Sequence, residues 1–203
     1  MSAPIKFILS LLILSSLMGC TVSPPRDLNN ICEIFREKDS WYEEAADSRE
    51  QWGSPISIMM AIMHQESRFI QNAKPPRKKM LGFIPGPRLS SSYGYSQAKT
   101  ETWKTYMRGS GNRGADRDDF GDAIDFIGWY NHTSGQRCQI ASDDAYHLYL
   151  AYHEGHGGFN RRTFRKKEWL KQVAKKVSSR ANRYRSQLLA CEKSLKKPWW
   201  HAF

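Results

Sequence analysis

The stretch ISIMMAIMHQE at residues 56–66 is apolar on almost every face of a helix. Such a helix is expected in the interior, because a helix on the surface keeps one polar face. Ser54 is the expected N-cap, and Pro55 suits the first helical position, where no backbone N–H is needed. The stretch therefore predicts a central buried helix that carries Glu66 at its C-terminal end.

Segments on both sides of this helix also repeat their apolar residues at helical spacing. They predict helices over about residues 27–50, 97–108, 118–130, 143–152 and 167–195. Ser142 is the expected cap of the fourth of these segments, and Gly155 its expected end. Pro and Gly are frequent in residues 71–92, which predicts an irregular loop, and no segment alternates convincingly like a strand. The chain is predicted to fold as an all-α globular domain.

The overall composition limits the class of protein. The chain has 203 residues, of which 40% are hydrophobic and 12% aromatic, so one domain with its own core is expected. The 31 Lys and Arg residues outnumber the 20 Asp and Glu residues, and the formal net charge is +11. Such a charge favours an anionic partner, such as nucleic acid or the surface of a membrane.

The N-terminus has the pattern of an export signal. Lys6 precedes an apolar run from Phe7 to about Leu17, which is too short to span a membrane comfortably. The sequence LMGC at residues 17–20 resembles the bacterial lipobox, in which Cys20 is lipidated and becomes the first mature residue. An ordinary signal peptide that happens to end near a cysteine is the alternative.

These features divide the chain into three expected parts. They are a signal peptide at residues 1–19, a lipidated tether at 20–26 and the globular domain at 27–203. Thr21 rather than Asp follows the cysteine, which by resemblance to lipoprotein sorting favours the outer membrane. We expect a periplasmic protein that its lipid attaches to the outer membrane. An exported protein is not expected to have nucleic acid as a partner.

Export to an oxidising compartment also bears on the cysteines. With Cys20 acylated, Cys32, Cys138 and Cys191 can form at most one internal disulfide. Cys32 lies in the first predicted helix, and Cys191 lies on the apolar stripe of the last one, which begins at Trp169. We expect a Cys32–Cys191 disulfide that joins these two helices. Three buried free thiols are the alternative.

Glu66 is the first candidate for chemistry. Its place at the end of an apolar helix predicts that desolvation and the negative end of the helix dipole raise its pKa. A carboxyl group that stays protonated near neutral pH is what a general acid requires. The alternative is that Glu66, like many Glu residues at helix ends, is solvated or ion-paired and has no catalytic role.

Three short segments occur in an order that carries a resemblance. They are HQESRF at residues 64–69, YGYSQA at 93–98 and AYHEG at 151–155. Together they resemble the soluble lytic transglycosylase (SLT) family, which shares the goose-type lysozyme fold. The family's corresponding motifs are Glu-Ser at the end of a buried helix, Gly-Leu-Met-Gln and Ala-Tyr-Asn-Ala-Gly. The resemblance covers about residues 52–160 and implies the lysozyme-like all-α fold.

The resemblance implies cleavage of peptidoglycan between N-acetylmuramic acid and N-acetylglucosamine without water, which leaves 1,6-anhydro ends. Glu66 would act as the single acid and base. Gln97 and Tyr152 match motif residues, so they would line the substrate groove. Tyr93 and Tyr95 would stack on sugar faces or pack the groove floor. Packing within the core is the alternative role for these four residues.

The chain departs from the family's motifs at several positions. His153 and Glu154 stand where the motif has Asn and Ala, and Ser96 stands where it usually has Met. These departures concern substrate contacts, and no catalytic role is assigned to Glu154. No cofactor and no metal are expected, because His153 and His156 flank a glycine and no further ligand shares their spacing.

Two other functions remain open beside the lytic transglycosylase. The first is a hydrolytic muramidase, which admits water in place of the sugar's C6 hydroxyl. The second is a lipoprotein that binds peptidoglycan without turnover, against which the intact Glu66 argues.

Overall fold

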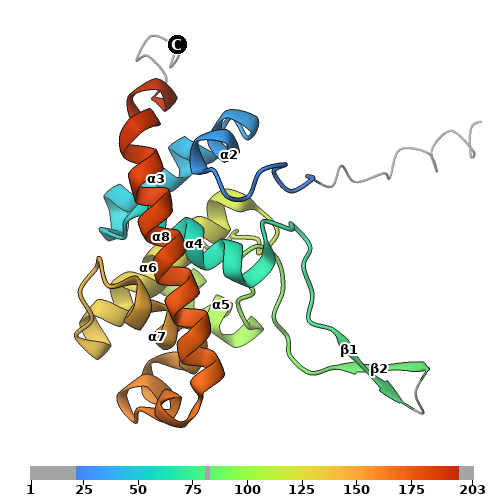
Figure 1. The fold of residues 1–203 in the computed structure, drawn as a ribbon. Coiled ribbons are helices and arrows are strands. Elements are labelled where there is room, and N and C mark those ends of the chain that lie inside the picture. The colour runs from blue at the N-terminus through green and yellow to red at the C-terminus, as the bar shows by residue number, and fades with distance from the viewer. Residues whose placement is uncertain (1–21, 81–82, 197–203) are drawn as a thin grey trace, which may run out of the picture.

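The computed structural model describes residues 22–80 and 83–196, and Figure 1 shows a helical body from which one hairpin projects. The expected signal peptide and Cys20 lie outside the described residues. Within them, no helix is both long and apolar enough to cross a membrane. The body is all-α, as predicted. In chain order the elements are α2 (Ile31–Glu37), α3 (Trp41–Trp52), α4 (Ile56–Ser67), β1 (Arg77–Met80), β2 (Ile84–Arg88), α5 (Thr100–Ser110), α6 (Phe120–Cys138), α7 (Ala145–Asn160), the 3₁₀ helix η1 (Thr163–Lys166) and α8 (Glu168–Leu195).

The helix α4 lies at the centre of the body, as its apolar sequence predicts. Every residue from Ile56 to Met63 is buried, and the helix packs against α8, α6 and α3. Its cap differs from the prediction, because Pro55 occupies the N-cap position. The buried Ser54 hydroxyl instead accepts a hydrogen bond from Asn131 Nδ2 at 2.9 Å. This residue therefore ties the start of α4 to α6 rather than capping its own helix.

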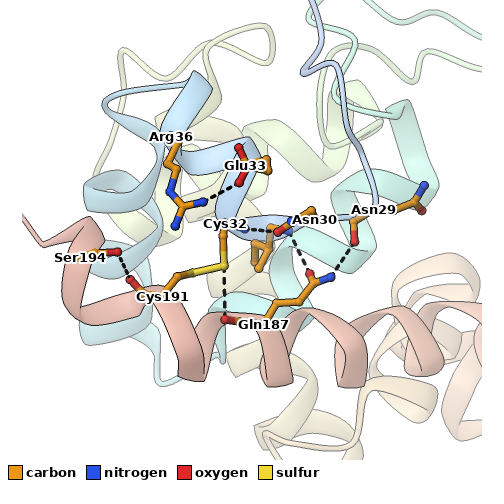
Figure 2. Close-up of a disulfide and its surroundings, with 9 residues drawn as sticks. Asn29, Asn30, Cys32, Glu33, Arg36, Gln187, Cys191 and Ser194 are labelled. Atoms are coloured by element: carbon orange, nitrogen blue, oxygen red, sulfur yellow. Dashed lines mark hydrogen bonds and ion pairs between the residues drawn. A yellow bond between two sulfur atoms is a disulfide. The ribbon is translucent and has the colours of Figure 1, made fainter.

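The long helix α8 crosses the body and contacts α4, α7 and α2. A disulfide joins Cys32 of α2 to Cys191 of α8, the pair expected from the sequence, with Cα atoms 6.2 Å apart. Figure 2 shows Gln187 beside this disulfide, where its amide accepts from the Ile31 N–H and donates to the Asn29 carbonyl, each at 3.0 Å. A bridge over 159 residues stabilises the fold by about 5 kcal/mol in the chain-entropy account.

Residues 71–92 contain the main departure from the predicted fold. The strands β1 and β2 pair antiparallel, with Arg77 opposite Arg88 and Met80 opposite Ile84, where the sequence predicts an irregular loop. The strand β2 reads IPGPR, and its Pro and Gly residues conceal the alternation that identifies a strand. The pairing is possible because a two-stranded hairpin has only edge strands, where Pro is tolerated.

Several predicted helix boundaries need correction, and α6 continues to Cys138 where the prediction ends it at about Tyr130. The first predicted helix divides into α2 and α3. Asp144, not Ser142, caps α7, where its carboxylate accepts from the His147 N–H at 3.1 Å. Gly155 does not end α7 but forms a kink, with φ 73° and ψ 155°, after which helical turns continue. The left-handed φ suits glycine, and the kink redirects the helix next to the candidate site.

Candidate active site

Glu66 lies in the last turn of α4, where the central helix ends. Arg68 adopts a left-handed backbone with φ 53°, and its N–H donates to the His64 carbonyl at 3.0 Å. Phe69, the next residue, is completely buried and anchors the chain beyond the helix. The fold therefore holds Glu66 at the junction between the central helix and the segment that leads to the hairpin.

The Glu66 carboxyl has an unusual environment for an acid. Burial raises its pKa from 4.5 to about 7, and a hydrogen bond from the Tyr149 hydroxyl opposes this rise only in part. The negative end of the α4 dipole acts in the same direction as burial. The carboxyl group is therefore present in both protonation states near neutral pH. Such a group can donate a proton and accept one in successive steps.

A cleft of about 380 Å³ opens over Glu66. Side chains from α4, α5, α6 and α7 line it, together with the segment between the hairpin and α5. Two of the predicted site residues, Gln97 and Tyr152, share this cleft with Glu66. The complete lining is Glu66, Ser90, Ser92, Gln97, Lys99, Thr102, Phe126, Tyr130, Tyr152, His153, Glu154 and Gly155.

Gln97 and Tyr152 hold the segment before α5 against the body. Gln97 has a left-handed backbone with φ 50°, and its Nε2 donates to the carbonyls of Ala73 and Gly94 at 2.9 Å each. The Tyr152 hydroxyl donates to the Ser96 carbonyl at 2.6 Å, and burial raises the pKa of this phenol well above its usual value. Both side chains therefore line the cleft and also fix its wall.

Tyr93 and Tyr95 do not line this cleft. Tyr95 is only 1% exposed, and its ring packs against Trp41 and Phe120 at centroid distances of 5.8 and 5.9 Å. The half-buried Tyr93 donates its hydroxyl to the Asp118 carboxylate at 2.8 Å. The structure corrects the sugar-stacking prediction for Tyr95, which packs in the core. Aromatic residues beside a glycine suit either role, so the local sequence could not decide between them.

The cleft also contains aromatic residues that sequence analysis missed. Phe126 and Tyr130 of α6 line it, and the Tyr130 and Tyr152 rings lie 5.1 Å apart. Tyr149, which hydrogen-bonds Glu66, precedes Tyr152 by three residues on α7. Residues three apart share one helix face, so that spacing was the available signal for Tyr149.

Glu154 is a second carboxylate in the lining, and it is bound on both oxygens. Its side chain is only 4% exposed, and Lys167 Nζ lies 2.7 and 3.0 Å from its two oxygens. The Thr163 hydroxyl donates to it, and His153 Nδ1 lies 3.1 Å away. Burial alone would raise the pKa of this carboxyl, but these partners lower it to about 2. Glu154 is therefore held as an anion by its partners.

The site combines an acid that can exchange its proton with an anion that cannot. No three His, Cys, Asp or Glu side chains in the described part of the chain gather closely enough to hold a metal ion. The chemistry that these residues can perform is proton transfer to and from a ligand in the cleft.

Comparison with known proteins identifies the family. A family model described as Transglycosylase SLT domain matches residues 8–191. No curated protein and no solved structure matches the chain. The family match confirms the resemblance carried by the three short segments and supports a transglycosylase-like function on peptidoglycan. The chain belongs to the transglycosylase SLT domain family.

Proposed function

We propose that this protein is a peptidoglycan lytic transglycosylase with Glu66 as its single acid and base. The observation that carries the proposal is the Glu66 carboxyl in the cleft, whose pKa burial raises to about 7. A pKa near the working pH suits a group that must give up a proton and then recover one.

The reaction divides into two proton transfers. Glu66 first donates its proton to the glycosidic oxygen as the bond from that oxygen to C1 of N-acetylmuramic acid breaks. The Glu66 carboxylate then accepts the proton of the sugar's C6 hydroxyl as this oxygen forms a bond to C1. The products are a free N-acetylglucosamine hydroxyl and a 1,6-anhydro end, and Glu66 is protonated again. The substrate's acetamido group stabilises the positive charge that develops at C1.

The state of Glu154 supports a mechanism with one carboxylate. Glycosidases with two catalytic carboxylates need the second one free, either to attack the sugar or to activate water. Both Glu154 oxygens accept hydrogen bonds from Lys167, and one also accepts from Thr163. The anion is thus occupied within the protein, and Glu66 is left as the group that exchanges protons.

The test is digestion of purified sacculi by a soluble form that begins at residue 21, with mass spectrometry of the released muropeptides. The proposal expects 1,6-anhydro ends from the wild type and strongly reduced release by Glu66→Gln, which keeps the side-chain shape. Reducing ends would identify a hydrolytic muramidase. Binding without release by the wild type would identify a wall-binding protein. A fully active Glu66→Gln variant would exclude the mechanism.

We also propose that a lipid on Cys20 holds the enzyme at the outer membrane from the periplasmic side. The first described residue, Val22, donates its N–H to Gln71 Oε1 at 2.7 Å, so the tether leaves the body near the segment that leads to the hairpin. Fatty-acid labelling and membrane fractionation of wild type and Cys20→Ser test this. Equal labelling of both forms would exclude the anchor.

A further inference from the structure

Trp169 occupies a place that the sequence pattern does not predict. Helical spacing puts it on the apolar stripe of the last helix, yet its side chain is 57% exposed in the first turn of α8. Its ring contacts His153, with centroids 5.2 Å apart and planes at 79°. His153 lines the cleft over Glu66, so Trp169 directly contacts a residue of the cleft lining.

A set of charged contacts holds this corner of the cleft together. Glu154 forms an ion pair with Lys167, which lies two residues before Trp169. It also accepts a hydrogen bond from the Thr163 hydroxyl of η1. These contacts join α7 to the start of α8. The ion pair between the buried Glu154 and the half-exposed Lys167 therefore fixes the start of α8, where Trp169 lies, relative to α7.

The same carboxylate orients His153. Because the Lys167, Thr163 and His153 contacts keep Glu154 ionised in spite of its burial, it can only accept a hydrogen bond from His153 Nδ1. The proton of a neutral His153 is therefore on Nδ1, and Nε2 is left with a lone pair. The imidazole is 36% exposed, so a ligand hydroxyl can donate to that nitrogen.

We propose that Trp169 and His153 form a sugar-binding subsite at the α7–α8 side of the cleft. The Trp169 ring packs on the apolar face of a pyranose, and His153 Nε2 accepts from one of its hydroxyl groups. The expected ligand is an N-acetylated hexose of a glycan strand, and this choice of ligand rests on the proposed function. It binds a sugar beyond the one that Glu66 acts on and so lengthens the strand that the cleft holds.

Exposure alone does not distinguish Trp169, since Leu189 of the same helix is 75% exposed. The difference is the neighbour: Trp169 contacts a residue of the Glu66 cleft, whereas Leu189 lines a separate groove with residues of α3 and α4. Leu189→Ala is therefore the matched control for Trp169→Ala, because both remove an exposed apolar side chain from α8.

The experiment measures binding without turnover, in a Glu66→Gln parent that begins at residue 21. A soluble chitin oligosaccharide is titrated by calorimetry, and cosedimentation with sacculi provides a second assay. Trp169→Ala is expected to weaken binding about tenfold and Trp169→Phe less than about threefold, while Leu189→Ala leaves it unchanged. Oligosaccharide is also expected to change the tryptophan fluorescence of the parent more than that of Trp169→Phe.

Three results would overturn the subsite. They are parent-like binding by Trp169→Ala, an equal loss in Leu189→Ala, and an undiminished fluorescence change in Trp169→Phe. The last result applies even if Trp169→Ala does not fold. Failure of the proposed function is a separate outcome: a Glu66→Gln parent that releases muropeptides as fast as the wild type excludes the acid–base role, whereas the binding comparison still decides the subsite.

Discussion

Two carboxylates line one cleft, and their surroundings give them opposite properties. Glu66, at the end of the apolar α4, has the Tyr149 hydroxyl beside it, and burial raises its pKa to about 7. Glu154, beside the kink of α7, would also have its pKa raised by burial, but Lys167, Thr163 and His153 lower it to about 2. Burial therefore raises a carboxyl pKa towards neutrality, as proton transfer requires, only where no cation compensates the charge.

The largest expected effect is on turnover. Glu66→Gln should lower muropeptide release by roughly 10²–10⁴-fold, the usual contribution of general acid–base catalysis. Glu154→Gln should leave kcat much closer to wild type and raise KM, because Glu154 positions His153 and the start of α8. Rates on sacculi over a range of substrate concentrations measure both. Equal losses of kcat in the two variants would mean that Glu154 takes part in the chemistry.

A second effect is on stability: at neutral to alkaline pH, Glu66→Gln should raise the free energy of unfolding and Glu154→Gln should lower it. The folded state raises the Glu66 pKa above its ordinary 4.5, so its contribution to stability is present below about pH 4.5 and is lost as the pH rises to about 7. Above neutral pH, Glu66→Gln should therefore raise the free energy of unfolding by roughly 1–3 kcal/mol. Denaturant unfolding at about pH 5 and about pH 8 measures the difference. A variant less stable than wild type at the higher pH would contradict the raised pKa.

Glu154 should show the reverse dependence. Its lowered pKa contributes stability above about pH 4.5, and this contribution is lost as the pH falls towards 2. Glu154→Gln should cost roughly 1–3 kcal/mol at neutral pH, because it leaves Lys167 without its buried partner, and much less near pH 2. The same unfolding measurements in acid test this. A constant difference across the pH range would show that the ion pair is not its source.

The smallest effect concerns the pH dependence of activity. For the wild type, kcat/KM should fall as the pH rises through about 7, since Glu66 must begin the reaction protonated. Tyr149→Phe removes a hydrogen bond that lowers the Glu66 pKa, so it should move this alkaline limb to higher pH by less than about one unit. Profiles of kcat/KM for both proteins measure the shift. A limb displaced to lower pH would contradict the assigned direction.

Part of the site could be predicted because it depends on short segments. The apolar residues 56–66 require a buried helix, and a carboxyl at its end is desolvated wherever the rest of the chain packs. Gln97 and Tyr152 were expected from the resemblance to the SLT family's motifs, and both line the cleft. Trp169 and Tyr95 could not be placed in this way, because an aromatic residue satisfies the same local pattern in the core and on the surface.

The amino-acid sequence was enough to predict the central helix, the acid at its end and the helical body, and it favoured the Cys32–Cys191 pair over three free thiols. Each depends on the spacing of apolar residues or on the small number of thiols. The folded arrangement, in contrast, is what keeps Glu154 ionised although it is buried, since its partners Thr163 and Lys167 come from elements beyond the kink at Gly155. It likewise decided which aromatic rings face the cleft. A pKa depends on every group within a few ångströms, and that neighbourhood exists only after the chain has folded.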